Sequence, residues 1–143
     1  MPARSGTAEW KGDLEAGSGQ FSLGSGACEG SYSYKSRFKD EGVPGSNPEE
    51  LIAAAHASCF SMALANALAA GGHRPESIRT TAVVHLAVTE DGPTITRIEL
   101  SCEGKVPGIA AEAFLQAAEE TKVGCPVSRA LSAVPINLEA RLL

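Results

Sequence analysis

The feature that most constrains this chain is a long apolar segment, residues 51–70, with the sequence LIAAAHASCFSMALANALAA. Its length is close to that of a membrane-spanning helix. However, the segment is dominated by alanine, has no Lys or Arg near its start, and contains four polar side chains: His56, Ser58, Ser61 and Asn66. These features argue against a membrane span, so we expect a core helix of a soluble protein.

Both ends of this helix are marked in the sequence. Ser46 or Asn47 can cap its first amides, and Pro48 suits the first helical position. The two glutamates that follow oppose the positive end of the helix dipole, and the glycine pair at residues 71–72 ends the helix. A helix that is apolar on nearly all sides must be enclosed by other elements. A single chain of 143 residues has limited means of doing so, which favours an oligomer.

Length and composition narrow the class of protein. A chain of 143 residues is long enough for one domain with a core and too short for two, so residues 1–143 are predicted to form a single domain. A net charge of -5 gives no basic surface for a nucleic acid. The N-terminus lacks the apolar stretch of a secretory signal. We therefore expect a cytoplasmic protein, and thiols in the cytosol are normally reduced.

The segments before the apolar helix predict short strands. The alternation in residues 30–38, GSYSYKSRF, places Tyr32 and Tyr34 on one face, as in a half-buried strand. Shorter strands around residues 7–12 and 19–24 would complete an N-terminal meander.

The segments after the helix predict a hairpin, two helices and a closing strand. Residues 78–106 form two β-rich runs joined by a turn at residues 91–93. Helices are predicted at residues 108–123 and 125–131, and a strand at residues 136–143. This order of elements implies an α+β fold in which antiparallel sheets are wrapped around central helices.

The four cysteines carry the most chemical information. None forms a C-x-x-C pair, which excludes the thioredoxin-like motif and the common structural zinc patterns, and we expect no metal and no cofactor. Cys28, in a Gly- and Ser-rich turn, and Cys102, in a predicted strand, are most simply incidental thiols. Cys125 lies between Gly124 and Pro126 at the start of a helix. That position lowers the pKa of a thiol and favours reactivity.

The relation between Cys59 and Cys125 is left open by their spacing. A free cysteine often packs as a small apolar side chain, so two separate core cysteines are one possibility. The other is a redox couple. If the fold brings the two Cα atoms within about 4.4–6.8 Å, the thiols can form a disulfide, which in the cytosol is usually transient and catalytic.

The segments NPEELIAAAHASCFSMAL and GCPVSRAL, with an upstream strand that ends in SRF, resemble the OsmC/Ohr family of osmotically induced and organic hydroperoxide resistance proteins. The likeness is greatest to the OsmC branch and extends over essentially the whole chain. It implies a thiol peroxidase that reduces hydroperoxides, organic ones especially. It also implies an intertwined homodimer with its active sites at the interface, and an external dithiol reductant of the lipoyl type.

The resemblance also implies the roles of four residues. Cys59 matches the peroxidatic cysteine and Cys125 the resolving cysteine, which condenses with the sulfenic acid of Cys59 to form a disulfide. Arg37, in SRF, and Glu49, in NPEE, match the arginine and glutamate of the family's active site. Arg37 would stabilise the Cys59 thiolate and the peroxide oxygen that develops charge. Glu49 would hold the guanidinium in a two-point pair.

Other interpretations remain. Local reasoning favours Cys125 as the thiol of lower pKa, whereas the resemblance makes Cys59 the attacker; we follow the resemblance because a directed arginine contributes more than a helix terminus. His56, which lies three residues before Cys59, could act as a base in a cysteine hydrolase or transferase. In most proteins such a histidine is a satisfied core residue. A noncatalytic protein that binds an apolar ligand is the second alternative.

Overall fold

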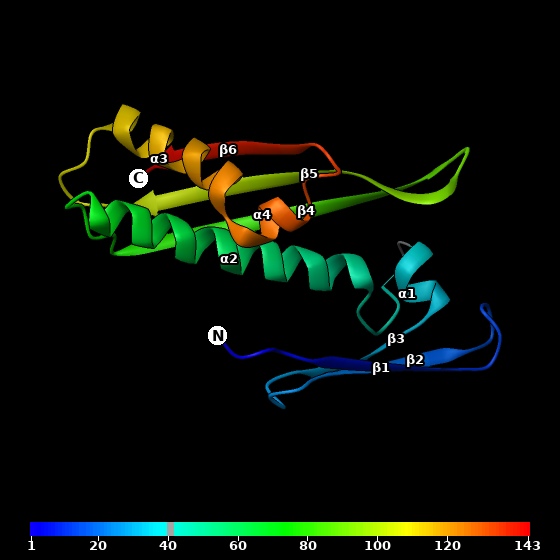
Figure 1. The fold of residues 1–143 in the computed structure, drawn as a ribbon. Helices are drawn as coiled ribbons and strands as arrows, with labels where there is room; N and C mark the ends of the chain where they lie inside the picture. The colour runs from blue at the N-terminus through cyan, green and yellow to red at the C-terminus, as the bar shows by residue number, and fades with distance from the viewer. Residues whose placement is uncertain (40–41) are drawn as a thin grey trace. The chain divides into compact units, whose positions relative to one another are not determined.

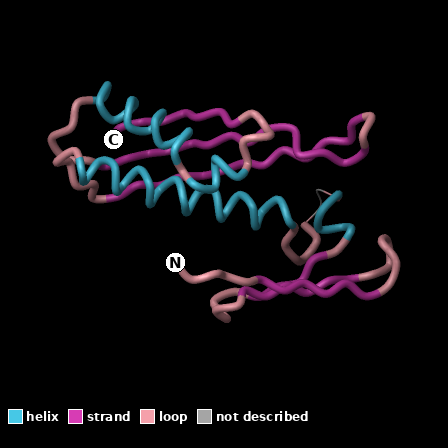
Figure 2. The backbone as a smooth tube through the Cα atoms, in the orientation of Figure 1, coloured by secondary structure: helices cyan, strands magenta, loops and turns pink. Residues whose placement is uncertain are grey.

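The computed structural model describes residues 1–39 and 42–143 of the chain (Figures 1 and 2). Helices and strands are mixed in it, which confirms the predicted α+β class. The chain divides into two compact units, Met1–Leu51 and Ile52–Leu143.

The first unit contains a three-stranded antiparallel meander, which confirms the prediction for the N-terminus. The strands follow one another in the order β1 (Gly6–Lys11), β2 (Ser18–Leu23) and β3 (Glu29–Tyr32). Gly19 of β2 is paired with Trp10 on one side and Tyr32 on the other. A Cβ atom at Gly19 would lie 2.3 Å from the Tyr32 ring. The glycine therefore makes room for Tyr32, whose ring centroid lies 5.5 Å from that of Trp10.

The strand predicted over residues 30–38 ends at Tyr32, so the prediction is wrong for its second half. A short helix, α1 (Tyr34–Phe38), follows instead. Its start is a reciprocal cap: Ser33 Oγ accepts from the Ser36 N–H at 3.1 Å, and Ser36 Oγ accepts from the Ser33 N–H at 2.8 Å. These local hydrogen bonds override the alternating pattern, because they satisfy the amides that begin a helix.

The long helix α2 (Pro48–Ala70) begins and ends where the sequence predicts. Asn47 Oδ1 accepts from the backbone N–H of Glu50 at 2.9 Å, which makes Asn47 the capping residue. At the other end Gly72 has φ +89°. Its N–H donates to the Ala69 carbonyl at 3.0 Å, and the His73 N–H donates to the Leu68 carbonyl at 2.9 Å. This is a Schellman motif, which closes the helix.

The sheet of the second unit is built from β4 (Ser77–Thr89), β5 (Gly92–Lys105) and β6 (Ile136–Leu142). β4 and β5 form the predicted antiparallel hairpin. β6 pairs with β5 in parallel, so the prediction of purely antiparallel sheets is wrong at this strand. Parallel neighbours need a long crossover, and the chain between β5 and β6 supplies one through α3 (Ala111–Gly124) and α4 (Pro126–Ala130).

One hydrophobic core holds the second unit together. α2 contributes Phe60, Leu64 and Leu68, which recur at helical spacing and are almost completely buried. α3 contributes Phe114 and Ala118, and the inward residues of β5, together with Val106 and Cys125, complete the cluster. Both long helices run along the sheet (Figure 1).

The single chain leaves much of α2 uncovered. Only 22% of its most apolar 18-residue stretch is buried, and by length and composition alone the helix could cross a membrane. Met62, for example, is 74% exposed. The chain itself therefore covers only one face of the helix that the sequence predicts to lie in a core.

Candidate active site

The fold brings Cys59 and Cys125 into contact. Cys59 lies within α2, and Cys125 lies between α3 and α4. Their sulfur atoms are 3.1 Å apart, although the two residues are 66 positions apart in the sequence. Both are free thiols in this structure. The two cysteines are therefore not separated in the core, which was one of the two possibilities that their spacing left open.

The backbone around Cys125 fixes its position. Its N–H donates to the Thr121 carbonyl at 2.9 Å, and its own carbonyl accepts from the Arg129 N–H at 3.0 Å. Cys125 thus ends α3 and begins α4, with Pro126 at the first helical position, as the sequence predicts. The residue is 1% exposed, whereas Cys59 is only partly buried. Of the two thiols, Cys59 is the more accessible.

The surroundings shift the pKa values of the two thiols in opposite directions. Burial raises the pKa of the Cys59 thiol; hydrogen bonding with the Val127 backbone offsets this in part, and Cys125 raises the pKa further. Burial acts in the same way on Cys125, but hydrogen bonding with the Ser128 backbone, the Cys59 thiol, the Ser128 hydroxyl and the Val127 backbone outweighs it, so the pKa of Cys125 is lowered. Of the two thiols, Cys125 therefore has the lower pKa in these surroundings.

Arg37 and Glu49 form an ion pair in the first unit. The guanidinium Nη2 donates to Glu49 Oε1 at 2.8 Å, and Nε donates to Oε1 and Oε2 at 3.2 and 3.3 Å. Glu49 is buried and Arg37 is about one-third exposed. Arg37 lies in α1 and not in the strand that the sequence predicts. The structure thus pairs the two thiols in the second unit and these two charged side chains in the first unit.

The hydrogen-bond partner of His56 is Ser128, whereas the sequence suggested that His56 could act on Cys59. Its Nε2 lies 2.7 Å from Ser128 Oγ, and both residues are buried. Burial lowers the pKa of His56, which favours a neutral ring. Sequence reasoning missed Ser128. The only local signal was its place three residues after Cys125 at the start of a helix, where a hydroxyl can face the capping residue.

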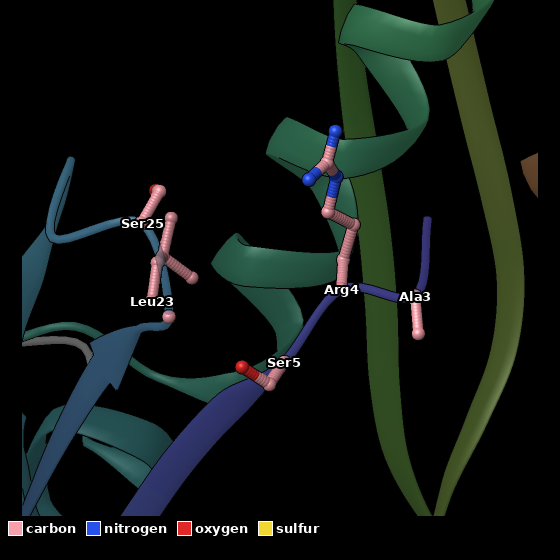
Figure 3. Close-up of a pocket in the computed structure, with 6 residues that line it drawn as sticks. Ala3, Arg4, Ser5, Leu23 and Ser25 are labelled. Atoms are coloured by element: carbon pink, nitrogen blue, oxygen red, sulfur yellow. The ribbon is translucent and has the colours of Figure 1, made fainter. Parts of the chain in front are cut away.

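No other feature of the described residues competes with the thiol pair. A cavity of about 630 Å³ lies near the N-terminus, and none of the four candidate residues lines it (Figure 3). Its lining residues are Ala3, Arg4, Ser5, Leu23, Gly24 and Ser25. Within residues 1–39 and 42–143, no three His, Cys, Asp or Glu side chains gather as a metal ion would require.

Comparison with known proteins identifies the family. Residues 39–139 match the family model described as OsmC-like protein. The chain belongs to the OsmC family. Over 140 residues it is 47% identical to Peroxiredoxin OsmC of Escherichia coli strain K12, a match that covers 97% of this chain and 96% of that protein.

Solved structures share the OsmC-family fold. The organic hydroperoxide resistance protein OhrB of Bacillus subtilis superposes with a TM-score of 0.75 at 21% identity, over 96% of this chain and 98% of that one. An OsmC-like protein of unknown function from Vibrio cholerae gives a TM-score of 0.77 at 19% identity, over 99% of this chain and 100% of that one. At these identities the likeness establishes the fold.

Proposed function

We propose that this chain is a cysteine-based peroxidase that reduces hydroperoxides, organic ones preferentially, to alcohols. The observation that carries the proposal is the contact between the Cys59 and Cys125 sulfurs, 3.1 Å apart, in a chain that is 47% identical to a peroxiredoxin over nearly its whole length. The two sulfurs need to approach each other by only about 1 Å more to reach the length of a disulfide bond, and a disulfide in the cytosol is usually transient and catalytic.

The reaction assigns a different task to each cysteine. The Cys59 thiolate attacks the hydroperoxide, an S–O bond forms, the O–O bond breaks, and the leaving alkoxide takes a proton to give an alcohol. Cys125 then attacks the sulfenic acid of Cys59, and water leaves as the disulfide forms. The burial of the two residues supports these roles. An attacking thiol must meet the substrate, whereas a resolving thiol needs to meet only its partner, and Cys125 is the buried one.

The raised pKa of Cys59 calls for a cation beside its sulfur in the working enzyme. Arg37 is our candidate, because it is permanently charged and can donate to both the thiolate and the departing oxygen. Glu49 orients its guanidinium through the two-point pair described above.

A second copy of the chain completes the proposed enzyme. The low burial of this apolar helix within its own chain supports an intertwined homodimer, because a second copy of the chain could cover it. An external dithiol, of the lipoyl type, reopens the disulfide after each turnover. We infer that the enzyme works in the cytosol, and that residues 1–143 act as one domain, since the match to the peroxiredoxin continues through both compact units.

The two alternative functions have less support. A cysteine hydrolase would use His56 as a base toward Cys59, but His56 Nε2 is hydrogen bonded to Ser128. A noncatalytic ligand-binding protein gives no reason for two thiols to lie in contact.

Treatment with one equivalent of an organic hydroperoxide is the direct test of this function. We expect the intact mass to fall by two hydrogens, and peptide mapping to locate the new disulfide between Cys59 and Cys125 of one chain. The same experiment on Cys28→Ser controls for pairing through the exposed thiol of Cys28. An unchanged mass would favour a binding protein, and a covalent acyl adduct after incubation with an activated ester would favour a hydrolase.

Loss of the guanidinium should slow the attack on the hydroperoxide. We expect Arg37→Gln to reduce the second-order rate constant about 10²- to 10³-fold, the usual effect of removing one donor to a developing anion. Rapid-mixing measurements of hydroperoxide consumption by reduced protein would show it. Arg97→Gln is the matched control, because Arg97 is an exposed arginine on β5 that is also paired with a glutamate. Equal rate constants for Arg37→Gln and Arg97→Gln would remove Arg37 from the mechanism.

A further inference from the structure

The ion pair between Arg37 and Glu49 joins the short helix α1 to the first turn of α2. A helix of five residues is not stable by itself. An ion pair whose arginine is about one-third exposed contributes little to holding such a helix. A group that stabilises a developing charge must nevertheless be kept close to its working position. Other contacts must therefore fix α1 relative to Glu49.

Two hydrogen bonds of Ser36, the residue before Arg37, connect α1 to the start of α2. Ser36 Oγ lies 2.7 Å from the Ser46 carbonyl oxygen and 3.1 Å from that of Ser33. A hydroxyl has one hydrogen to donate, and the shorter distance assigns it to the Ser46 carbonyl. The Ser36 carbonyl accepts the second bond, from Asn47 Nδ2, at 3.2 Å. We call these two bonds, Ser36 to Ser46 and Asn47 to Ser36, the α1–α2 clasp.

The Asn47 side chain contacts both helices. Its Oδ1 accepts from the Glu50 N–H at 2.9 Å, while its Nδ2 donates to the Ser36 carbonyl. The opposite orientation of the amide would place its NH₂ group against an N–H and its oxygen against a carbonyl, so only this orientation satisfies both neighbours. The cap of α2 thus requires an oxygen at this position, whereas the connection to α1 requires the NH₂ group.

The clasp is also anchored on the N-terminal meander. The Ser46 N–H donates to the Ser31 carbonyl of β3 at 2.8 Å, and Ser46 forms a β-bridge with Tyr32. Gly45 has φ +116°, and a Cβ atom there would lie 3.0 Å from the Ser31 carbonyl oxygen. The glycine therefore permits this close approach. Because Ser46 is bonded to a strand, the clasp holds α1 against a fixed backbone.

We propose that Ser36 and Asn47 are positioning residues, which hold the Arg37 guanidinium in the orientation that the attack on a hydroperoxide requires; the proposal rests on the peroxidase function proposed above. Arg37 follows Ser36 directly, and Glu49 lies two residues after Asn47. The clasp therefore sets the separation of the two backbone segments that carry the ion pair. Glu49 then fixes the direction of the guanidinium through Nε and Nη2.

Substitutions can separate the clasp from the ordinary capping of α2. Asn47→Ser keeps a residue that caps helices well and lacks the NH₂ group that reaches Ser36. Ser36→Ala removes the hydroxyl of the clasp, and Ser36→Thr keeps it. Asn137→Ser, at an exposed asparagine on β6, is the matched control for Asn47. Ser25→Ala is the control for Ser36, because Ser25 is an exposed serine whose hydroxyl also accepts from a backbone N–H.

The first test measures the hold on Arg37 without any hydroperoxide. Exchange of the Arg37 Nε–H with water is followed by ¹⁵N NMR of the reduced full chain, and the signal is identified by its loss in Arg37→Gln. We expect exchange to be about tenfold faster in Asn47→Ser and Ser36→Ala, the usual effect of losing one hydrogen bond. Ser36→Thr and the two controls should give the rate of the unmodified chain.

The second test measures the rate constant for hydroperoxide consumption by rapid mixing. We expect Asn47→Ser and Ser36→Ala to lower it about tenfold, less than Arg37→Gln does, because the guanidinium is still present but less well placed. Ser36→Thr should retain most of the activity. In an Arg37→Gln background, Asn47→Ser should change the rate constant by less than about twofold, since the group that it positions is gone. A general folding defect would lower the rate in both backgrounds.

The outcomes separate this inference from the proposed function. Unchanged Nε–H exchange in Asn47→Ser and Ser36→Ala would overturn the positioning role, and so would faster exchange with an unchanged rate constant. An additive loss on combining Asn47→Ser with Arg37→Gln would overturn it as well, because Asn47 would then act independently of Arg37. Failure of the unmodified chain to consume hydroperoxide would instead overturn the peroxidase function, and the exchange measurements would still decide whether the clasp holds Arg37.

Discussion

Cys59→Ser is expected to abolish hydroperoxide consumption, with a loss of about a thousandfold or more, because the variant lacks the attacking atom. A serine hydroxyl stays protonated near neutral pH and does not attack the O–O bond, whereas a thiolate does. Serine is close to cysteine in size, so the packing of α2 is preserved. Consumption of an organic hydroperoxide in the presence of an excess dithiol, measured colorimetrically, would show the loss.

The control for this experiment is Cys28→Ser, which removes an exposed thiol and should consume hydroperoxide at the rate of the unmodified chain. Full activity in Cys59→Ser would reverse the assignment of the cysteines. That result would make Cys125, whose pKa is lowered, the attacking residue, as local reasoning about the helix start suggested. Circular dichroism of each variant would separate lost chemistry from lost folding.

The ends of α2 could be predicted because the signals that set them are local. Asn47 caps the first turn with its own side chain, and Gly72 adopts the positive φ that closes the last turn. Each signal acts within a few residues of the helix terminus. The hairpin of β4 and β5 is predictable for the same reason, since its turn residues lie between the two strands.

Two features of the fold could not be predicted from the same kind of pattern. Residues 34–38 alternate as a strand would, but the Ser33 and Ser36 side chains satisfy the amides of a helix start. β6 alternates correctly, yet alternation carries no information about strand direction. Its parallel pairing with β5 follows from the crossover through α3 and α4, which is a property of the topology.

In the candidate site, too, some residues could be predicted from the sequence and others could not. Cys59 and Cys125 were recognisable from the residues that flank them, and so was the pairing of Arg37 with Glu49, which the structure forms. Ser128 was not, because its partner His56 lies 72 residues away and only the tertiary fold brings them together. The local sequence around a buried histidine on an apolar helix does not indicate which residue is its hydrogen-bond partner.

The opposite pKa directions of the two thiols fit a sequential mechanism. The groups around Cys125 in its own unit lower the pKa of its thiol without a cation. Cys59 has a raised pKa in the same surroundings, so its activation depends on a charge supplied from elsewhere, in our proposal by Arg37. In this proposal, different groups therefore activate the attacking thiol of Cys59 and the resolving thiol of Cys125.

Cys125→Ser is therefore expected to preserve the first attack and to prevent its completion. Reduced protein should consume about one equivalent of organic hydroperoxide per chain rapidly, after which steady turnover with an external dithiol falls about a hundredfold or more, because no disulfide forms. Quenched samples analysed by mass spectrometry should contain Cys59 sulfenic acid first and sulfinic acid later. A chemical trap for sulfenic acid should label Cys59 in this variant.

Sustained turnover of Cys125→Ser at the rate of the unmodified chain would contradict this expectation, since it would mean that the external dithiol reduces the sulfenic acid directly. The matched comparison is Cys102→Ser, which removes the other buried cysteine, on β5, and leaves the thiol pair in place. If only Cys125→Ser accumulates sulfinic acid at Cys59, the buried sulfur 3.1 Å away protects the catalytic thiol by reaching its oxidised form before a second hydroperoxide does.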